Sequence, residues 1–352
     1  MTINIRKATL VALAFGALAG LASGQPVPRL NDHVPGSVLI YPIYISDFTN
    51  GYASVVSVSN TNGDRRFVLP GNPPGVRGDV LAHYFWIDGT GTWNVFDNQA
   101  LLTPNDTRSI LSYDALNGTG NQDFETGFLV IEAVDPETQE SVDFDYLIGD
   151  IILVDIAGTR TWNIEATGIK ALTDELVGNP VRSNRGHAFV DRVANGGDGD
   201  GNLDFDNVEY QRWPDVLFLS SFFRQDDGAN GTNNDCDVIL LTDLGRDFRV
   251  NLQFLFYDRD EDETSRTGDF VCWTRADLFA LANITATASF DPAGWGRINS
   301  PDAINLITGA VVADPCLMGA MVQSIIGQAG LEFGHLMHHS GINPTAAQFN
   351  LD

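Results

Sequence analysis

Short segments rich in β-branched and aromatic residues alternate along the chain with clusters of Gly, Asn and Asp. Strand-like segments in the first half lie at 38–45, 53–59, 80–87, 127–134 and 151–156. Turn clusters separate them, for example at 60–64 and 88–91. Short strands spaced evenly by turn residues are typical of a sandwich or a barrel. We therefore expect an all-β fold built of antiparallel β-sandwich units, Ig-like or jelly-roll-like.

The second half of the chain repeats the order of the first. The corresponding segments are 216–219 with 38–41, 237–242 with 54–59, 250–257 with 80–87, 278–285 with 101–107, 294–295 with 127–128, and 306–309 with 147–149. A repeat of about 160–180 residues is far longer than a solenoid repeat and indicates a duplicated domain. The length of 352 residues also exceeds the usual size of a single core. We expect domains at 25–173 and 213–352, joined by an acidic linker rich in Gly, Asp and Asn at 174–212.

The first 24 residues have the features of a cleaved signal peptide. Arg6 and Lys7 precede a small, apolar run at 8–22, and small residues at 22–24 follow. An uncleaved N-terminal anchor is the alternative. Because the expected cleavage site has no Cys and no second long apolar run follows, we expect neither a lipid anchor nor direct membrane insertion. The expected location is secreted, periplasmic or cell-surface associated.

The chain carries a formal net charge of −26, and its lysines are Lys7 and Lys170 alone. Binding to nucleic acid depends on cationic contacts to phosphate, so nucleic acid is not expected as a partner. An anionic membrane surface is disfavoured for the same reason. The charge suits a salty medium or a protein that gathers divalent cations, and solubility alone explains it equally well.

Residues 198–209 carry oxygen ligands at alternate positions of an acidic loop. The predicted calcium ligands are Asp198, Asp200, Asn202, Asp204, Asp206 and Glu209. This spacing resembles an EF-hand-type calcium loop, and the resemblance covers these twelve residues only. The loop departs from that pattern at its sixth position, where Leu203 replaces the usual Gly. The resemblance implies calcium as a cofactor that stiffens the linker, and a solvated acidic loop is the alternative.

The cysteines are Cys236, Cys272 and Cys316. In an oxidising compartment one pair is expected to form a disulfide. Cys236 and Cys272 flank predicted strands and are the preferred pair, with Cys316 as a possible substitute for either.

His335, His338 and His339 form the one histidine cluster of the sequence. On a helix, His335 and His339 would share a face and offer two ligands to zinc. A loop is the equal alternative, and Leu336 replaces the Glu that a zinc-protease motif needs after its first His. The sequence leaves open whether these histidines bind a metal.

No nucleophile elbow, phosphate-binding loop or dinucleotide fingerprint occurs in the sequence, so no catalytic residue is predicted. Trp93 lies among Gly, Thr and Asn and is the best candidate for an exposed, ligand-contacting aromatic. Our first hypothesis is a secreted, non-catalytic structural or adhesive protein. The alternatives are a calcium-assisted carbohydrate-binding protein and an unrecognised extracellular hydrolase. The expected partner is an extracellular glycan or an envelope protein.

The calcium hypothesis predicts that a chelator lowers the melting temperature of the secreted protein, because a ligand that binds only the native state stabilises it. The double substitution Asp198→Ala with Asp200→Ala removes that shift. Asp260→Ala with Asp262→Ala, in a second acidic run, is the matched control and keeps it. Thermal unfolding with and without EDTA makes the comparison, and identical melting temperatures for the unsubstituted protein would contradict calcium binding.

Overall fold

The structure is a computed structural model. It describes residues 34–63, 78–89, 95–116, 125–155 except 138, 140 and 143, 160–170, 216–223, 236–258 except 243, 245 and 246, 261–284, 293–324 except 314 and 316, and 332–339 except 337. In these ranges the helical elements are short: the 3-10 helix η1 (Phe48–Asn50) and the α-helices α2 (Ser112–Leu116) and α3 (Leu278–Leu281). None of the described helices is long and apolar enough to cross a membrane. The predicted all-β class is confirmed.

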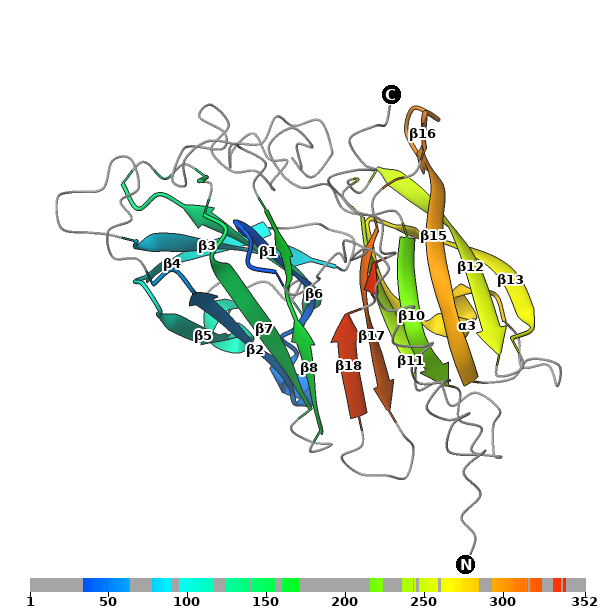
Figure 1. Ribbon diagram of the computed structural model, residues 1–352, viewed down its shortest axis with the longest axis horizontal. Coiled ribbons are helices and arrows are strands. Elements are labelled where there is room, and N and C mark those ends of the chain that lie inside the picture. The colour runs from blue at the N-terminus through cyan, green and yellow to red at the C-terminus, as the bar shows by residue number, and fades with distance from the viewer. Residues whose placement is uncertain are drawn as a thin grey trace, which may run out of the picture. The chain divides into compact units, whose positions relative to one another are not determined.

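The described strands of the first half form two antiparallel sheets (Figure 1). A five-stranded sheet has the order β4-β3-β6-β1-β9, with β1 at Val38–Ile45, β3 at Val80–Asp88, β4 at Val95–Leu102, β6 at Thr126–Val134 and β9 at Thr167–Ile169. A four-stranded sheet has the order β5-β2-β7-β8, with β2 at Tyr52–Asn60, β5 at Thr107–Leu111, β7 at Leu147–Asp155 and β8 at Arg160–Glu165. Strands β1, β2, β3, β6 and β7 overlap the segments expected from β-branched and aromatic residues, whereas β4, β5, β8 and β9 were not predicted.

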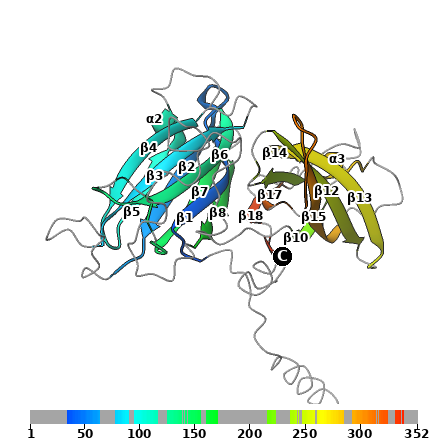
Figure 2. The ribbon, with the colours of Figure 1, turned by 90° about the horizontal axis from the view of Figure 1, so that it is seen from above.

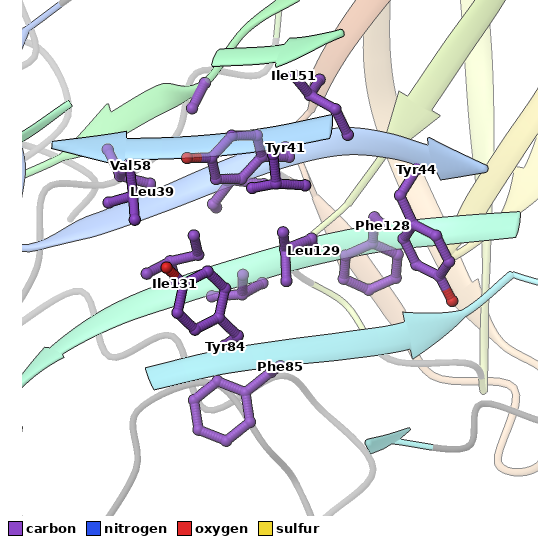
Figure 3. Packing of buried hydrophobic residues seen from close by; sticks show 14 of the residues in the cluster. Leu39, Tyr41, Tyr44, Val58, Tyr84, Phe85, Phe128, Leu129, Ile131 and Ile151 are labelled. Atoms are coloured by element: carbon purple, nitrogen blue, oxygen red, sulfur yellow. The ribbon is translucent and has the colours of Figure 1, made fainter. Parts of the chain in front are cut away.

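Side chains from both sheets of the first half share one hydrophobic cluster (Figure 3). Tyr84 of β3 belongs to it together with Leu39 of β1 and Val58 of β2, and all three are fully or almost fully buried. Successive residues of a strand point to opposite sides, and Figure 3 shows Tyr84 and Phe85 on the two sides of β3. Because Phe85 is also fully buried, this sheet is covered on both sides.

The second half also forms two antiparallel sheets. The larger has the order β13-β12-β15-β10-β19, with β10 at Val216–Phe223, β12 at Phe248–Asp258, β13 at Glu263–Val271, β15 at Ala293–Asn305 and β19 at His338–His339. The short strand β16 (Val311–Ala313) pairs with β15. The smaller sheet has the order β14-β11-β17-β18, with β11 at Cys236–Leu241, β14 at Trp273–Asp277, β17 at Met318–Ser324 and β18 at Glu332–Leu336.

The strand order of the second pair of sheets is that of the first pair, position by position. Their irregularities agree as well: the pairing of β1 with β6 shifts register between Tyr41 and Tyr44, and that of β10 with β15 shifts between Leu219 and Phe222. A short helix directly follows β5 in one half and β14 in the other.

Four of the six expected matches between the two halves fall on corresponding strands, and the matches of 278–285 and 306–309 are wrong. Residues 237–242 fall on β11, the counterpart of β2, but the expected match is one residue out of register. The backbone N–H of Thr242 donates to the carbonyl of Cys272 as that of Asn60 donates to Asp106, so Thr242 corresponds to Asn60 and not to Ser59. Leu278 begins helix α3, whose counterpart α2 begins at Ser112 and not at residue 101. Residues 306–309 lie in the turn between β15 and β16. Short apolar runs do not by themselves distinguish a helix, a strand or a turn.

Trp273 links the second half of the chain to the first. Its indole Nε1 donates a hydrogen bond of 2.7 Å to the carbonyl oxygen of Pro42. A Cβ atom at Gly89 would lie 2.6 Å from the Trp273 ring, so the side chain packs directly on this glycine. Trp273 belongs to the hydrophobic cluster of the first half, together with residues of β11 and β17: Ile239, Leu241, Met318, Ala320 and Val322. These residues form one side of β11 and β17, and the first half therefore buries that side.

Trp273→Ala is expected to lower the free energy of unfolding by about 3–5 kcal/mol, because it removes a large buried side chain and leaves a cavity. Trp295→Ala is the matched control: Trp295 is 41% exposed, against 9% for Trp273, and its loss is expected to cost about 1 kcal/mol. Urea unfolding of both variants tests this. Equal losses would contradict the role assigned to Trp273.

Two buried tyrosines of β1 are expected to respond oppositely to removal of the hydroxyl. Tyr41 donates to the carbonyl oxygen of Ser57 at 2.8 Å, whereas the Tyr44 hydroxyl is buried and has no hydrogen-bond partner in the described part of the chain. Tyr41→Phe should therefore cost about 1 kcal/mol, and Tyr44→Phe should raise stability by about 1 kcal/mol by removing an unsatisfied group. Shifts of the urea midpoint in the same direction would refute this difference.

Candidate functional site

Strands β13, β12 and β15 lie side by side in the larger sheet of the second half (Figure 1). Along β12, one side of this sheet belongs to the core and the other carries mainly polar and aromatic side chains. Along β12, Leu252, Phe254 and Phe256 are buried in the hydrophobic cluster of the second half. Asn251, Gln253, Leu255 and Tyr257 alternate with them and point to the opposite side, where Leu255 is almost buried, because side chains alternate along a strand. We call this side, with the residues of β13 and β15 paired to it, the outer face. Figure 2 shows the same neighbouring strands from above.

An aromatic pair lies at one end of the outer face. Tyr257 and Trp295 are opposite each other in register, and their rings stack with centroids 4.1 Å apart and planes inclined by 13°. The Tyr257 hydroxyl donates to Glu263 of β13 at 2.8 Å. This hydrogen bond is the main cause that raises the pKa of Tyr257 above its usual value, while Arg297 acts in the opposite direction. Tyr257 thus remains a neutral donor at physiological pH and holds its ring against Trp295.

Hydrogen-bonding side chains occupy the middle of the outer face. Asn299 Nδ2 donates to Gln253 Oε1 at 3.5 Å, and Arg297 lies between Asn299 and Trp295 along β15. In the described part of the chain, Arg297 Nε and Asn299 Oδ1 are buried atoms without a hydrogen-bond partner. Leaving such atoms unsatisfied costs free energy. This region therefore contains a donor and an acceptor whose hydrogen-bonding capacity is unused in the described structure.

The far end of the outer face is polar and slightly acidic. Asn251 Nδ2 donates to Asp302 Oδ1, and Arg249 Nε lies 3.9 Å from Asp269 Oδ2 in a half-exposed ion pair. With Glu263 and Arg297, the outer face carries a small excess of carboxylates over guanidinium groups. Arg249 is paired with Asp269 across neighbouring strands, and the carboxylates of this face leave no strong positive patch.

The corresponding side of the first-half sheet differs in both exposure and chemistry. Gly127 is opposite Asp88 in register as Gly294 is opposite Asp258, so Phe128 corresponds to Trp295. Phe128 is 0% exposed, whereas Trp295 is 41% exposed. The first half thus has the buried apolar residues Phe128 and Val130 where the second half has Trp295 and Arg297.

The described first half also contains a buried polar cluster. His83 Nε2 lies 3.0 Å from Asp97 Oδ2, and Glu132 is opposite His83 in register. The Ser141 hydroxyl donates to Glu132 Oε1. Because His83 and Glu132 are almost fully buried, we assign this cluster to the packing of the sheet.

Many of the predicted site residues lie outside the described residues. These are the predicted calcium ligands Asp198, Asp200, Asn202, Asp204, Asp206 and Glu209, together with Trp93 and Cys316. In the described part of the chain, no group of three or more His, Cys, Asp or Glu is placed to hold a metal ion.

The predicted disulfide between Cys236 and Cys272 is not present. Cys236 begins strand β11, and the carbonyl of Cys272 accepts from the backbone of Thr242, just beyond the other end of that strand. Six residues of extended strand separate the two ends by about 20 Å. A disulfide requires Cα atoms within about 7 Å, so this pairing is excluded by the register of the sheet. The thiol of Cys236 lies 3.2 Å from the sulfur of Met321.

The histidine cluster, for which a helix and a loop were both considered, lies on strands. His335 lies on β18 opposite Met321, and His339 lies on β19 opposite Leu217. The two strands belong to different sheets. His335 and His339 therefore do not share a helical face.

Comparison with known proteins gives no match to any family model and none to any curated protein. The functional conclusion therefore depends on the chemistry of the outer face. Trp295 and Tyr257 were not among the predicted site residues. A partial signal was present: residues 250–254 alternate apolar with polar residues, whereas 80–87 is apolar except for His83. Alternation of this kind indicates a strand with one solvated side.

Proposed function

We propose that the protein is a secreted, non-catalytic adhesive protein that contacts its partner through the outer face of β13, β12 and β15. The observation that carries this proposal is the exposure of Trp295 beside polar side chains, at a position where the first half has a fully buried Phe128. A large aromatic side chain held on an exposed sheet is a common anchor of binding surfaces.

We further propose that the protein consists of two tandem β-sandwich domains that arose by duplication. The identical strand order of the two halves and their shared register shift support the duplication. The sandwich arrangement is supported by the cluster that both sheets of the first half share. A sandwich places one side of each sheet in its core and leaves the other for contacts.

Export from the cytoplasm is supported by the signal-peptide pattern of the first 24 residues. After removal of this segment, Lys170 is the one lysine left, and the charge becomes still more negative. We place the protein in the extracellular or envelope compartment, where a calcium ion bound by the loop at 198–209 would stiffen the segment between the domains.

The test is retention of the labelled mature protein on washed extracellular and envelope material from the producing cells. Arg297→Glu is expected to reduce retention about tenfold, because it reverses the charge at the centre of the outer face. Arg266→Glu is the matched control: Arg266 is opposite Phe254 in register and so lies on the other side of the same sheet.

Retention of Arg266→Glu should equal that of the unsubstituted protein. Thermal unfolding of both variants verifies that they are folded. Equal retention of all three proteins would disprove the assignment of the contact surface.

A further inference from the structure

We propose that the outer face binds a neutral polysaccharide chain, with Trp295 as the stacking platform for one sugar ring. This inference rests on the proposed function and specifies the ligand of the same surface. It follows from the geometry of the aromatic pair, the hydrogen-bonding side chains along β15, and the charge of the protein.

Trp295 is held as an exposed, preorganised ring. Tyr257 stacks on one side of the indole, and the bond from the Tyr257 hydroxyl to Glu263 fixes Tyr257 in turn. The Trp295 side chain is nevertheless exposed. The C–H groups on one side of a pyranose ring form an apolar patch that packs on such an aromatic surface. A ring that is already fixed loses little conformational entropy when the ligand binds.

Hydrogen-bonding groups extend from Trp295 along the strand. Arg297 and Asn299 follow at alternate positions of β15, and Asn299 is joined to Gln253 of β12. Four residues of extended strand span about 13 Å, which is longer than one sugar ring. Amide and guanidinium groups pair well with the vicinal hydroxyls of sugars, and Arg297 Nε and Asn299 Oδ1 have no partner in the described structure. The site therefore fits a chain of sugars.

Electrostatics select a neutral chain. The formal net charge is −26, and the outer face itself includes Glu263, Asp269 and Asp302. An anionic polymer would be repelled by this field. A second copy of the protein carries the same negative charge, and Trp295 is the one large hydrophobic side chain of the outer face among those described as exposed.

The experiment is affinity electrophoresis of the mature protein in gels that contain mixed-linkage β-glucan, xylan or dextran, with alginate as the anionic probe. We expect at least one neutral glycan to retard the protein and alginate to leave it unretarded. Trp295→Ala should weaken the retardation at least about tenfold, and Trp295→Phe should retain part of it. Phe48→Ala is the control, because Phe48 is an exposed aromatic outside the outer face, and it should bind as the unsubstituted protein does.

Circular dichroism verifies the fold of each variant, and Trp295→Phe keeps the test decisive if Trp295→Ala fails to fold. Glycan binding that is equally strong in Trp295→Ala overturns the inference, as does binding to alginate alone. Absence of retardation by every neutral glycan also overturns it. If the glycan test fails but Arg297→Glu still reduces retention on envelope material, the proposed function survives. If the glycan test fails and Arg297→Glu leaves retention unchanged, both proposals fail.

Discussion

The burial of Trp273 against the first half is the interaction on which the arrangement of the other surfaces depends. Its indole hydrogen bond to Pro42 is made in an apolar setting, where an unmade bond would be costly. Packing at this point buries the neighbouring side of β11 and β17, so that Ile239 and Leu241 are fully buried. One side of a sheet that would otherwise be solvated becomes part of a hydrophobic core.

The two halves show how the environment of a sheet determines its residues. Ser57 and Ser109 form an exposed cross-strand hydrogen bond of 3.0 Å on the first-half sheet, as do Ser59 and Thr107 at 2.7 Å. The register of β2 with β5 and of β11 with β14 makes Ile239 the counterpart of Ser57, and Ile239 is buried. In the duplication that we propose, corresponding positions have diverged in polarity according to whether they are covered.

The sequence predicted the class of the fold because strand period and turn residues are local signals. The strands around 38–45 and 250–257 follow from β-branched and aromatic composition alone. The disulfide prediction failed because cysteine pairing depends on strand register, and Cys236 and Cys272 lie at opposite ends of one strand. The burial of Trp273 was also not predictable, because its neighbours Thr274 and Arg275 are polar and its partner Pro42 is distant in the chain.

Exposure of Trp295 is the feature least expected from folding alone. The first half demonstrates that this position accepts a buried Phe128, so the sheet does not require an exposed indole for its own stability. An exposed aromatic ring also creates a risk of self-association, which the charge of −26 reduces. Tyr257 and Glu263 nevertheless hold the ring in place from two neighbouring strands. The arrangement fixes a solvent-exposed ring at a position where folding does not require one, and this is why we propose binding as the role of this face.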